Sequence, residues 1–554
     1  MDILIVGAGL SGLTTALSLR RANSSHRITI LERSSSYNQS SSPSSPPSSS
    51  PSSTEYKSHE IGAAINVPPN ISRFLCHPLP GRGLGLDPIK QKFVKSEGML
   101  VLDWKTHEEL VEKGLDHSRC EEVWEGGALW YAHRVDLHGG LLGLVNGGGN
   151  VEGEEEEVKG KEKEEEKERD SLKEKELKVK VKVEERNLGD GEDDSEDGEG
   201  EDGNGEEQEE KKSRKNVKKS DSNKRKGWVK IEGGKEVVAY NPSKPSLTLS
   251  SDQTLTADLI IAADGVHSRA PDYVLGHPLE PQMLPDPKLN TCYRFLIPTS
   301  EIAKDPETQF FLDTDKKEAK VCRLWPDVEG KRRLIAYRCR GGEIFNFVVM
   351  LRDEENTAKR EDWHAPVSKS EVLSKLSDFH PGLLKVINKA TDLKRWPLLY
   401  RPPIPTWHKD RLVLVGDAAH PMLPHHGQGG AQAIEDGLAL GLCLSGNLSP
   451  SSSLSAEIEH RLKLYEKIRR NRASAIQVLS NVGIDEQPPK ELEEYLREEE
   501  EEGWWRGGVP SNMKEVIEFE YGSDVVGRTI KTMQEEVDEG WEVPRGFFPG
   551  FERE

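Results

Sequence analysis

The stretch that decides the fold reads Ile3-Leu4-Ile5-Val6-Gly7-Ala8-Gly9-Leu10-Ser11-Gly12. Its four consecutive apolar residues predict a strand that is buried on both faces, as in a parallel sheet. In the glycine pattern after this strand, Gly7 permits a tight turn, Gly9 leaves room for a pyrophosphate, and Gly12 allows close packing of the next helix. We expect this helix over residues 10–22, with its N-terminal amides directed toward the phosphates.

An acidic residue stands at the matching distance. A second strand is expected over residues 27–31, and Glu32 comes directly after it, 20 residues beyond Gly12. At this spacing a carboxylate at the tip of the strand accepts hydrogen bonds from the hydroxyl groups of an adenosine ribose. The strand, the glycine turn, the helix and the acidic residue together predict a dinucleotide-binding domain.

Two later segments repeat the order of buried strand and acidic turn. Residues 257–265 end in Asp264-Gly265, and residues 411–418 end in Gly416-Asp417-Ala418. A carboxylate at the carboxyl end of a parallel strand suits a sugar-like polyol, because it accepts hydrogen bonds without a counter-ion. Gly427-Gln428-Gly429-Gly430 then opens a helix, where glycines leave room for a flat ring and the helix N-terminus stabilises negative charge on it. An anionic reduced flavin is such a ring.

The chain of 554 residues carries a formal charge of −21, but its polarity is concentrated in two tracts. Residues 34–57 are mostly Ser and Pro, and residues 151–226 hold about 49 charged side chains with a net charge near −9. Neither tract buries enough apolar surface to offset the entropy of ordering it, so we expect both to be disordered. The remaining residues, roughly 450, have an ordinary globular composition.

The composition also excludes several classes of protein. No run of about 18 apolar residues is present and Met1 leads directly into a strand, so we expect no membrane span, no export and a cytoplasmic location. The acidic balance argues against nucleic-acid binding, although residues 211–226 form a local basic block. Six scattered cysteines without a Cys-x-x-Cys pair, and three histidines without regular ligand spacing (His420, His425, His426), predict no metal site.

Taken in order, these motifs resemble those of the FAD-dependent aromatic hydroxylases, the group A flavoprotein monooxygenases of the salicylate hydroxylase type, and above all their fungal members. The likeness rests on the glycine motif of residues 7–12, the Asp264-Gly265 turn, and the Gly416-Asp417 turn with residues 424–436. It implies an α/β fold, in which a Rossmann-like FAD-binding domain of the hydroxylase type carries an inserted, mostly antiparallel substrate domain and a C-terminal helical region.

The implied domain map is discontinuous. Residues 1–144, 228–277 and 395–482 are expected to form the FAD-binding domain, the last of them including a long helix. Residues 278–394 are expected to form the substrate domain. Residues 483–554 are predicted to form a helical extension that packs on the core.

The resemblance also implies roles for single residues. Glu32 would bind the adenosine ribose, Arg134 the pyrophosphate and ribityl region, Asp417 the ribityl chain and Gly430 the edge of the ring. The further candidates for cofactor binding are Gly7, Gly9, Gly12, Arg33, Ala63 and Asp264. From the residues alone, Arg134 has a second interpretation as a surface cation that pairs with Asp136 or Glu125.

The Asp264-Gly265 turn is tied in this family to both FAD and the nicotinamide donor. The family often places Arg three residues after the Ser of this turn, whereas here Pro271 stands there and Arg269 directly follows Ser268. The preference between NADPH and NADH therefore stays open, as does the oligomeric state.

In the family NAD(P)H reduces FAD, O2 forms a hydroperoxide at flavin C4a, and its terminal oxygen is transferred to an aromatic ring. We therefore expect hydroxylation of a small aromatic acid or phenol. The catalytic candidates are Tyr293 and Arg294, in a strand expected over residues 291–298, and His426 as a pocket wall or proton relay. Adjacent strand residues face opposite sides, so at most one of Tyr293 and Arg294 points inward, and both are alternatively ordinary sheet residues.

Two further functions stay open from the sequence. The same flavin motifs would serve an epoxidase or another oxidoreductase of a non-aromatic secondary metabolite. A flavin-binding scaffold whose acidic tract does the biological work is the third function considered. On the late helix, Tyr465, Arg469 and Arg472 follow an apolar stripe, which favours packing and helix pairing over catalysis.

Overall fold

The computed structural model describes most of the chain outside the two polar tracts. The described residues are 1–35, 37, 63–79, 81–110, 115–147, 227–279, 289–313, 321–327, 329, 331–354, 367–446, 454–484 and 486–549. The predicted disorder of residues 34–57 and 151–226 therefore concerns residues that lie outside this description, apart from Ser34, Ser35 and Tyr37. Contacts divide the chain into one unit of Met1–Asn146 with Gly227–Glu554 and a second of Gly147–Lys226. The sheets of the described residues all lie in the first unit.

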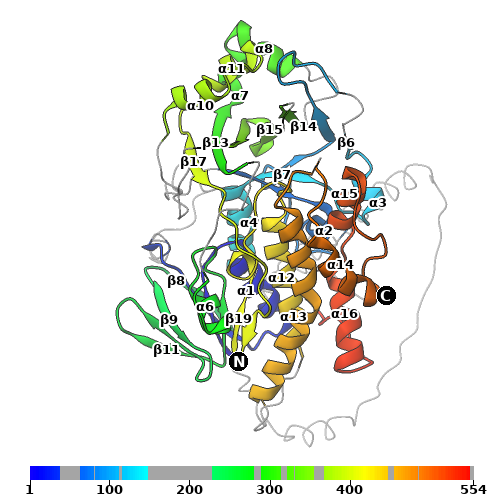
Figure 1. Cartoon of the computed structure of the whole chain (residues 1–554). Helices are drawn as coiled ribbons and strands as arrows, with labels where there is room; N and C mark the ends of the chain where they lie inside the picture. The colour runs from blue at the N-terminus through cyan, green and yellow to red at the C-terminus, as the bar shows by residue number, and fades with distance from the viewer. Residues whose placement is uncertain are drawn as a thin grey trace, which may run out of the picture. The chain divides into compact units, whose positions relative to one another are not determined.

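A six-stranded sheet in the order β18-β19-β12-β1-β2-β8 forms the first layer (Figure 1). Its strands are β1 (Asp2–Val6), β2 (Arg27–Leu31), β8 (Trp228–Glu232), β12 (Leu259–Ala262), β18 (His408–Lys409) and β19 (Leu412–Leu414). All pairings are parallel except β18 with β19 at the edge. The register pairs Val6 with Ala262 and Ala262 with Leu414, so the turns after β1, β12 and β19 meet at one edge of the sheet.

One helix packs on this sheet, and a second helix packs on the first through small residues. The helix α1 (Leu10–Ala22) packs along α12 (Gly429–Cys443), and α13 (Leu454–Leu479) lies beside α12. A Cβ atom on Gly441 of α12 would lie 2.4 Å from Ser18 Cβ of α1, so only glycine permits this approach. The bounds of β1, α1 and β2 agree with the sequence-based prediction.

A seven-stranded sheet in the order β17-β13-β16-β15-β14-β5-β6 forms the second layer, in the region expected to be the substrate domain. Its strands are β5 (Gly98–Val101), β6 (Leu115–Asp116), β13 (Thr291–Pro298), β14 (Val321–Pro326), β15 (Arg332–Cys339), β16 (Ile344–Leu351) and β17 (Lys394–Pro397). All pairings are antiparallel except β14 with β5. Because β5 and β6 come from residues assigned by sequence to the FAD-binding domain, the substrate sheet is not confined to residues 278–394.

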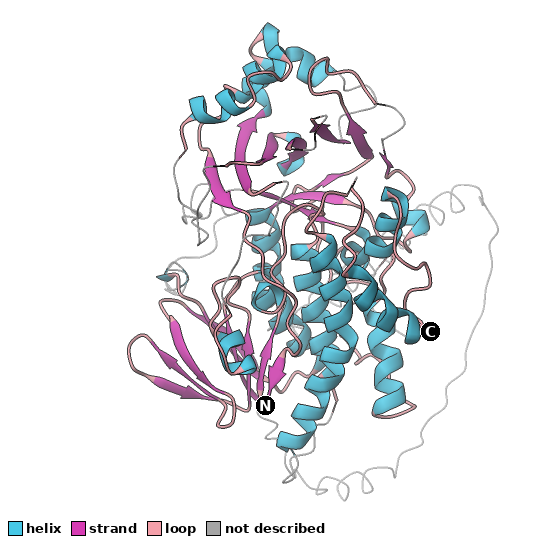
Figure 2. Ribbon diagram, viewed as in Figure 1, coloured by secondary structure: helices cyan, strands magenta, loops and turns pink. Residues whose placement is uncertain are grey.

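One face of this sheet is closed by four short helices (Figure 2). These are α7 (Thr299–Ala303), α8 (Pro306–Asp313), α10 (Lys369–Lys375) and α11 (Pro381–Ile387). They bury the side chains of alternate strand residues, among them Phe295, Phe347 and Leu334. The intervening residues point to the opposite face, which is therefore available to line a site.

Smaller elements complete the unit. Two three-stranded sheets have the orders β11-β10-β9 and β3-β7-β4. Their strands are β3 (Ala64–Val67), β4 (Val94–Lys95), β7 (Trp130–His133), β9 (Val237–Asn241), β10 (Ser246–Leu249) and β11 (Thr254–Thr256). The short helices are α2 (Pro69–Leu75), α3 (Cys120–Val123), α4 (Arg134–Gly147), α6 (Ala270–Leu275), η3 (Arg340–Gly342) and η4 (Gly416–Ala418).

The C-terminal segment is helical and packs on the rest of the unit, as predicted. It contains α14 (Leu492–Glu501), α15 (Met513–Tyr521) and α16 (Val525–Glu536). The helix α14 contacts α13, α15 contacts α2, and α16 contacts both α12 and α13. None of the helices in the described residues is long and apolar enough to cross a membrane.

Candidate active site

A cavity of about 1020 Å³ lies between the carboxyl edge of the six-stranded sheet and the free face of the seven-stranded sheet. Residues after β1, β12 and β19 line one end of it, including Gly9, Asp264 and Asp417. Residues of β13, β14, β15 and β16 line the other end. The two sheets thus each contribute one wall to a single site.

The three glycines after β1 differ in what surrounds them. Gly7 has φ +100°, and a Cβ there would lie 2.4 Å from the Ala263 carbonyl oxygen. A Cβ on Gly12 would lie 2.0 Å from the Gly7 oxygen. A Cβ on Gly9, at the N-terminus of α1, would meet nothing within 4 Å. Gly7 and Gly12 therefore shape the turn, whereas Gly9 faces open space in which an anion would meet the helix amides.

Glu32 lies at the tip of β2 beside this turn. Its Oε2 accepts a hydrogen bond from Ala8 N at 2.9 Å, and its Oε1 accepts one from Ser34 N at 2.9 Å. The carboxylate is therefore fixed next to the glycine turn, at the place the spacing predicts. Its contact with a ribose stays a prediction.

The turn after β12 holds a second carboxylate. Asp264 Oδ2 accepts a hydrogen bond from the Tyr240 hydroxyl at 3.1 Å. Burial raises the pKa of the Asp264 carboxyl to about 6, although hydrogen bonds from Ser268 and Tyr240 and the charge of Arg33 oppose the rise. Arg33 lines the cavity at the same end. Pro271, the departure from the family pattern, lies in the first turn of α6.

The turn after β19 presents Asp417 to the cavity. The side chain is open to the cavity, yet the surrounding protein excludes enough water to raise the pKa of its carboxyl above the ordinary value, a rise opposed by His420 and Arg134. Gly416, directly before it, has φ +60° and donates its N–H to Asp436 Oδ2 at 2.7 Å. The conformation of this turn therefore depends on Asp436.

Arg134 begins α4, and its backbone N–H donates to the Ala63 oxygen at 2.9 Å, so both residues lie on the cavity wall. Asp136, the partner proposed by the surface interpretation, instead accepts from Arg340 at 3.0 Å. Among the described residues, no carboxylate lies within 4.0 Å of the Arg134 guanidinium. Arg134 therefore provides a positive charge inside the site, and this charge opposes the rise in the pKa of the Asp417 carboxyl.

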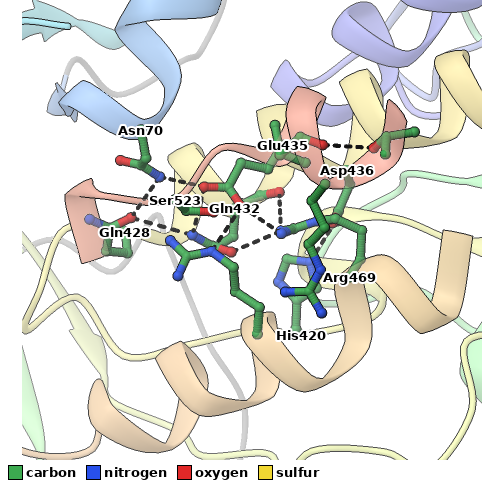
Figure 3. Close-up of polar contacts among 12 residues, drawn as sticks. Asn70, His420, Gln428, Gln432, Glu435, Asp436, Arg469 and Ser523 are labelled. Atoms are coloured by element: carbon green, nitrogen blue, oxygen red, sulfur yellow. Dashed lines mark hydrogen bonds and ion pairs between the residues drawn. The ribbon is translucent and has the colours of Figure 1, made fainter. Parts of the chain in front are cut away.

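Asp436, which accepts the Gly416 N–H next to Asp417, belongs to a buried network of ionised side chains (Figure 3). Arg469 donates from Nε to Asp436 Oδ1 at 2.9 Å and from Nη1 to Glu435 Oε2 at 2.5 Å, and all three side chains are at most 1% exposed. Asp436 Oδ2 also contacts His420 Nε2 at 2.6 Å.

This network fixes the protonation of the carboxyls within it. Although burial opposes ionisation, His420 and Arg469 hold the pKa of Asp436 below its ordinary value. Arg469 thus pairs helices α12 and α13, as the sequence favoured, but it does so through buried carboxylates that also fix the Gly416-Asp417 turn.

The loop before α12 is shaped by glycines. Gly427 has φ +64°, and a Cβ on it would lie 2.5 Å from Asn66 Nδ2. Gly430 lines the cavity in the first turn of α12, where a Cβ would lie 2.5 Å from Ile65 Cδ1. The backbone of this loop is thus exposed to the cavity beside a helix N-terminus, as a flat, electron-rich ring requires.

The strand β13 separates the two catalytic candidates it carries. Arg294 points into the cavity and its guanidinium lies 5.0 Å from the Trp396 ring centre. Tyr293 points to the opposite face, where its ring is buried among apolar side chains and its hydroxyl donates to Glu371 Oε1 at 2.8 Å. The prediction that Tyr293 is a catalytic residue is therefore wrong, because the twofold alternation of the strand removes it from the site.

Most residues at the end of the cavity lined by β13, β14, β15 and β16, here called the substrate wall, were not assigned a role from the sequence. The rings of Tyr131 and Tyr337 stack at 4.5 Å, and Tyr131 shares a hydrogen-bond chain with Ser96. Further lining residues without a sequence-based assignment are Met99, His117, Leu129, Cys322, Leu324, Arg333, Ile335, Val348, Met350, Trp396, Met422, Leu423, Ile484, Ile517 and Tyr521. Side chains alternate between the two faces of a strand, so the sequence of β15 could have placed Arg333, Ile335 and Tyr337 together on one face.

The two adjacent histidines of the loop before α12 behave differently. His426 has both ring nitrogens engaged within the protein, Nδ1 with Glu520 Oε1 at 2.6 Å and Nε2 with the Val482 oxygen at 3.1 Å. This leaves neither nitrogen for a substrate, so the geometry supports a positioning role instead of a proton relay. Burial lowers the pKa of His425, which also lines the cavity, to about 3, so this imidazole is neutral at pH 7.

The described residues contain no group of three or more His, Cys, Asp and Glu side chains arranged to hold a metal ion. All six cysteines are buried free thiols.

The donor set fits FAD. The open space at Gly9 before the α1 amides and the nearby Arg134 charge suit a pyrophosphate, and Asp417 suits a polyol chain. Gly430 and the N-terminus of α12 suit the flavin ring.

Comparison with known proteins agrees with this fit. The FAD binding domain family matches residues 221–480, and the NAD(P)-binding Rossmann-like domain family matches residues 5–74. The FAD-dependent monooxygenase cfoG of Aspergillus candidus is 34% identical over 536 residues, which cover 96% of this chain and 95% of the relative. The 3-hydroxybenzoate 6-hydroxylase 1 of Aquipseudomonas alcaligenes is 28% identical over 263 residues, 47% of this chain and 59% of the relative. A salicylate hydroxylase substrate complex shares the fold with a TM-score of 0.56 at 17% identity, over 96% of this chain and 98% of the other.

The chain therefore belongs to the FAD-dependent monooxygenases. Its cofactor is FAD, and the redox partner of the family is a nicotinamide dinucleotide.

The glycine turn gives a matched pair of substitutions. Gly9→Ala is expected to leave stability unchanged but to weaken FAD binding about tenfold or more, because its methyl group enters only the space that suits the pyrophosphate. Gly12→Ala is expected to cost roughly 3 kcal/mol of stability, because its methyl group meets the Gly7 oxygen. Urea unfolding of the apoproteins and titration with FAD check both. Equal FAD affinities of Gly9→Ala and the unmodified protein would contradict the assignment.

Proposed function

We propose that this enzyme hydroxylates a small phenol or aromatic acid, with NADH or NADPH as reductant and O2 as oxidant. The observation that carries the proposal is the position of Arg294 in a largely apolar and aromatic wall opposite the flavin loop. The other arginine of this wall, Arg333, pairs with Glu486 at 2.7 Å. An aromatic ring with one anionic substituent complements such a wall. The names of the relatives, which include a 3-hydroxybenzoate 6-hydroxylase, support the same substrate class.

The side chains of the substrate wall would act by binding and by electrostatics. Arg294 would pair with a carboxylate or lower the pKa of a phenol, since a nearby cation favours the ionised form. The stacked rings of Tyr131 and Tyr337 would pack against the substrate ring. When bound, FAD supplies the transfer of electrons from NAD(P)H and the activation of O2. The enclosing walls would keep water from the reacting centre.

The proposal is tested with the purified, FAD-loaded protein. Salicylate, 3-hydroxybenzoate and related phenolic acids are screened for stimulated NADH or NADPH consumption, and the products are identified by mass spectrometry. We expect at least one phenolic substrate to give a product with one added oxygen. A protein that takes up no FAD, or that yields no hydroxylated product from any phenol, would contradict the proposal.

Replacement of the cavity cation tests its role in binding. Arg294→Met is expected to raise KM for the phenolic acid found in this screen roughly 10- to 100-fold, the value of one or two lost charge-assisted hydrogen bonds. Arg395→Met is the matched control, because Arg395 lies on the adjacent strand β17 but contacts Glu371 outside the cavity. Steady-state kinetics at saturating O2 give KM and kcat. A similar KM for both variants would remove Arg294 from the substrate site.

A further inference from the structure

The C-terminal helix α15 contributes part of the substrate wall. Ile517 and Tyr521, four residues apart, lie on one face of the helix and line the cavity. Val516 and Phe519 face a separate apolar cluster formed with α13 and α14. Tyr521 is buried and lies near Tyr131 and Cys322, so it reaches the part of the cavity that the seven-stranded sheet encloses.

This helix lies beyond the part of the chain that matches the FAD binding domain family, which ends at residue 480. Its position is nevertheless fixed by polar contacts to the core. Arg472 of α13 donates to the Phe519 oxygen at 3.1 Å and to the Glu520 oxygen at 2.9 Å. Arg73 of α2 donates to the carbonyl oxygens of Gly522 and Ser523. Two cations thus satisfy the carbonyl end of α15, where the helix dipole favours positive charge.

A separate contact joins α15 to the loop that precedes the flavin-binding end of α12. Glu520 Oε1 lies 2.6 Å from His426 Nδ1, and both side chains are 1% exposed. His426 also contacts the Val482 oxygen, at the point where the chain leaves α13 for the C-terminal segment. Any displacement of this pair therefore moves Tyr521, the next residue after Glu520, relative to the flavin loop.

We propose that Ile517 and Tyr521 are specificity-determining residues, which set the size of the ring system that the cavity admits, and that the Glu520–His426 contact positions them. This inference rests on the proposed function, because it assumes that an aromatic compound occupies the cavity. It assigns the C-terminal helix a role in substrate selection, and it assigns His426 a positioning role.

The test compares two ortho-hydroxy acids that differ only by one fused ring, salicylate (2-hydroxybenzoate) and 3-hydroxy-2-naphthoate. Their dissociation constants are measured from changes in the flavin absorbance of the FAD-loaded, full-length protein, without turnover. In Tyr521→Ala we expect the preference for the smaller probe to fall about tenfold or more, because removal of a wall side chain opens space for the second ring. Ile517→Ala is expected to shift the preference in the same direction.

Three further sets of variants keep the test decisive. Tyr495→Ala is the matched control, because Tyr495 of α14 packs beside α13 away from the cavity, and its preference is expected to stay unchanged. Should Tyr521→Ala fail to load FAD, Tyr521→Trp tests the same wall by enlarging it, and it is expected to weaken naphthoate binding selectively. His426→Ala is expected to alter the preference, whereas His426→Gln, which retains a hydrogen-bonding group, restores it.

An unchanged ratio of dissociation constants in the FAD-loaded variants at both positions 517 and 521 would overturn the proposal. A protein that binds the probes but consumes no NAD(P)H with any phenol would overturn the proposed function alone, while the ratio still decides the role of α15. Binding of neither probe to the unmodified, FAD-loaded protein would overturn the inference about α15, whereas the screen of phenols decides the proposed function.

Discussion

Arg469→Met is expected to lower the free energy of unfolding by roughly 3–5 kcal/mol, which is the usual cost of removing one partner from a buried ionic network. Glu435 and Asp436 would each lose a charge-assisted hydrogen bond in a site from which water is excluded. The loss would also disturb the Gly416-Asp417 turn, which Asp436 holds. Urea unfolding of the unmodified protein and the variant measures the difference.

Arg470→Met is the matched control for this prediction. Arg470 is the next residue of α13, and it is partly exposed, with carboxylates no closer than 3.9 Å. We expect its replacement to change stability by less than about 1 kcal/mol. If both variants unfolded at the same urea concentration, the network would not stabilise the fold as described.

The second large effect concerns the cofactor. Asp417→Ala is expected to weaken FAD binding roughly 10- to 100-fold, because one carboxylate that accepts hydrogen bonds from a polyol is worth about 1.5–3 kcal/mol. The free energy of unfolding of the apoprotein is not expected to fall. Burial disfavours the charged Asp417 carboxylate, and no polyol is bound in the apoprotein to compensate for this cost. Titration of the apoprotein with FAD, followed by the quenching of flavin fluorescence, gives the dissociation constant.

Glu457→Ala is the control for Asp417→Ala. Glu457 is a carboxylate of α13 that binds Arg461 one helical turn away, outside the cavity. Its replacement is expected to leave the affinity for FAD unchanged. Equal affinities in the two variants would show that Asp417 has no part in the cofactor site.

The cofactor end of the site was predictable because its motifs are local. A strand, a glycine turn and a helix are adjacent in the chain, so residues 2–22 alone indicate a dinucleotide-binding turn. The pairing of Val6 with Ala262 and of Ala262 with Leu414 then brings the three turns to one edge of the parallel sheet. Arg134 was harder to assign, because an arginine near acidic residues in sequence is typically a surface ion pair. Only the structure shows that Asp136 pairs with Arg340 instead.

The substrate end was less predictable because its wall is assembled from distant segments. The alternation of side chains along β13 means that only one of Tyr293 and Arg294 can face the cavity. It does not predict which one, because the sequence does not show which face of the sheet is covered by helices. The strand β5 joins the substrate sheet from residues 98–101 through a long-range parallel pairing that no local pattern indicates. Likewise, nothing in the Glu-rich C-terminal sequence predicts that Tyr521 reaches the cavity.

The charged network illustrates the same limit. The spacing of Arg469 and Arg472 along α13 predicts packing and helix pairing, but because charged residues are rarely buried it does not indicate that their partners are buried carboxylates. Their buried partners, Glu435 and Asp436, lie more than 30 residues earlier in the sequence. Glu435 and Asp436 belong to a motif that is visible in the sequence. Their contacts with Arg469 are visible only in the structure.

Oxygen transfer to an aromatic ring is measured by the incorporation of ¹⁸O from ¹⁸O2, with the FAD-loaded enzyme, NAD(P)H and a phenolic acid. We predict one ¹⁸O atom in each molecule of hydroxylated product and one NAD(P)H consumed per product formed. Product that carries oxygen from water, or NAD(P)H consumption without any oxygenated aromatic product, would contradict the assignment of this enzyme as an aromatic hydroxylase.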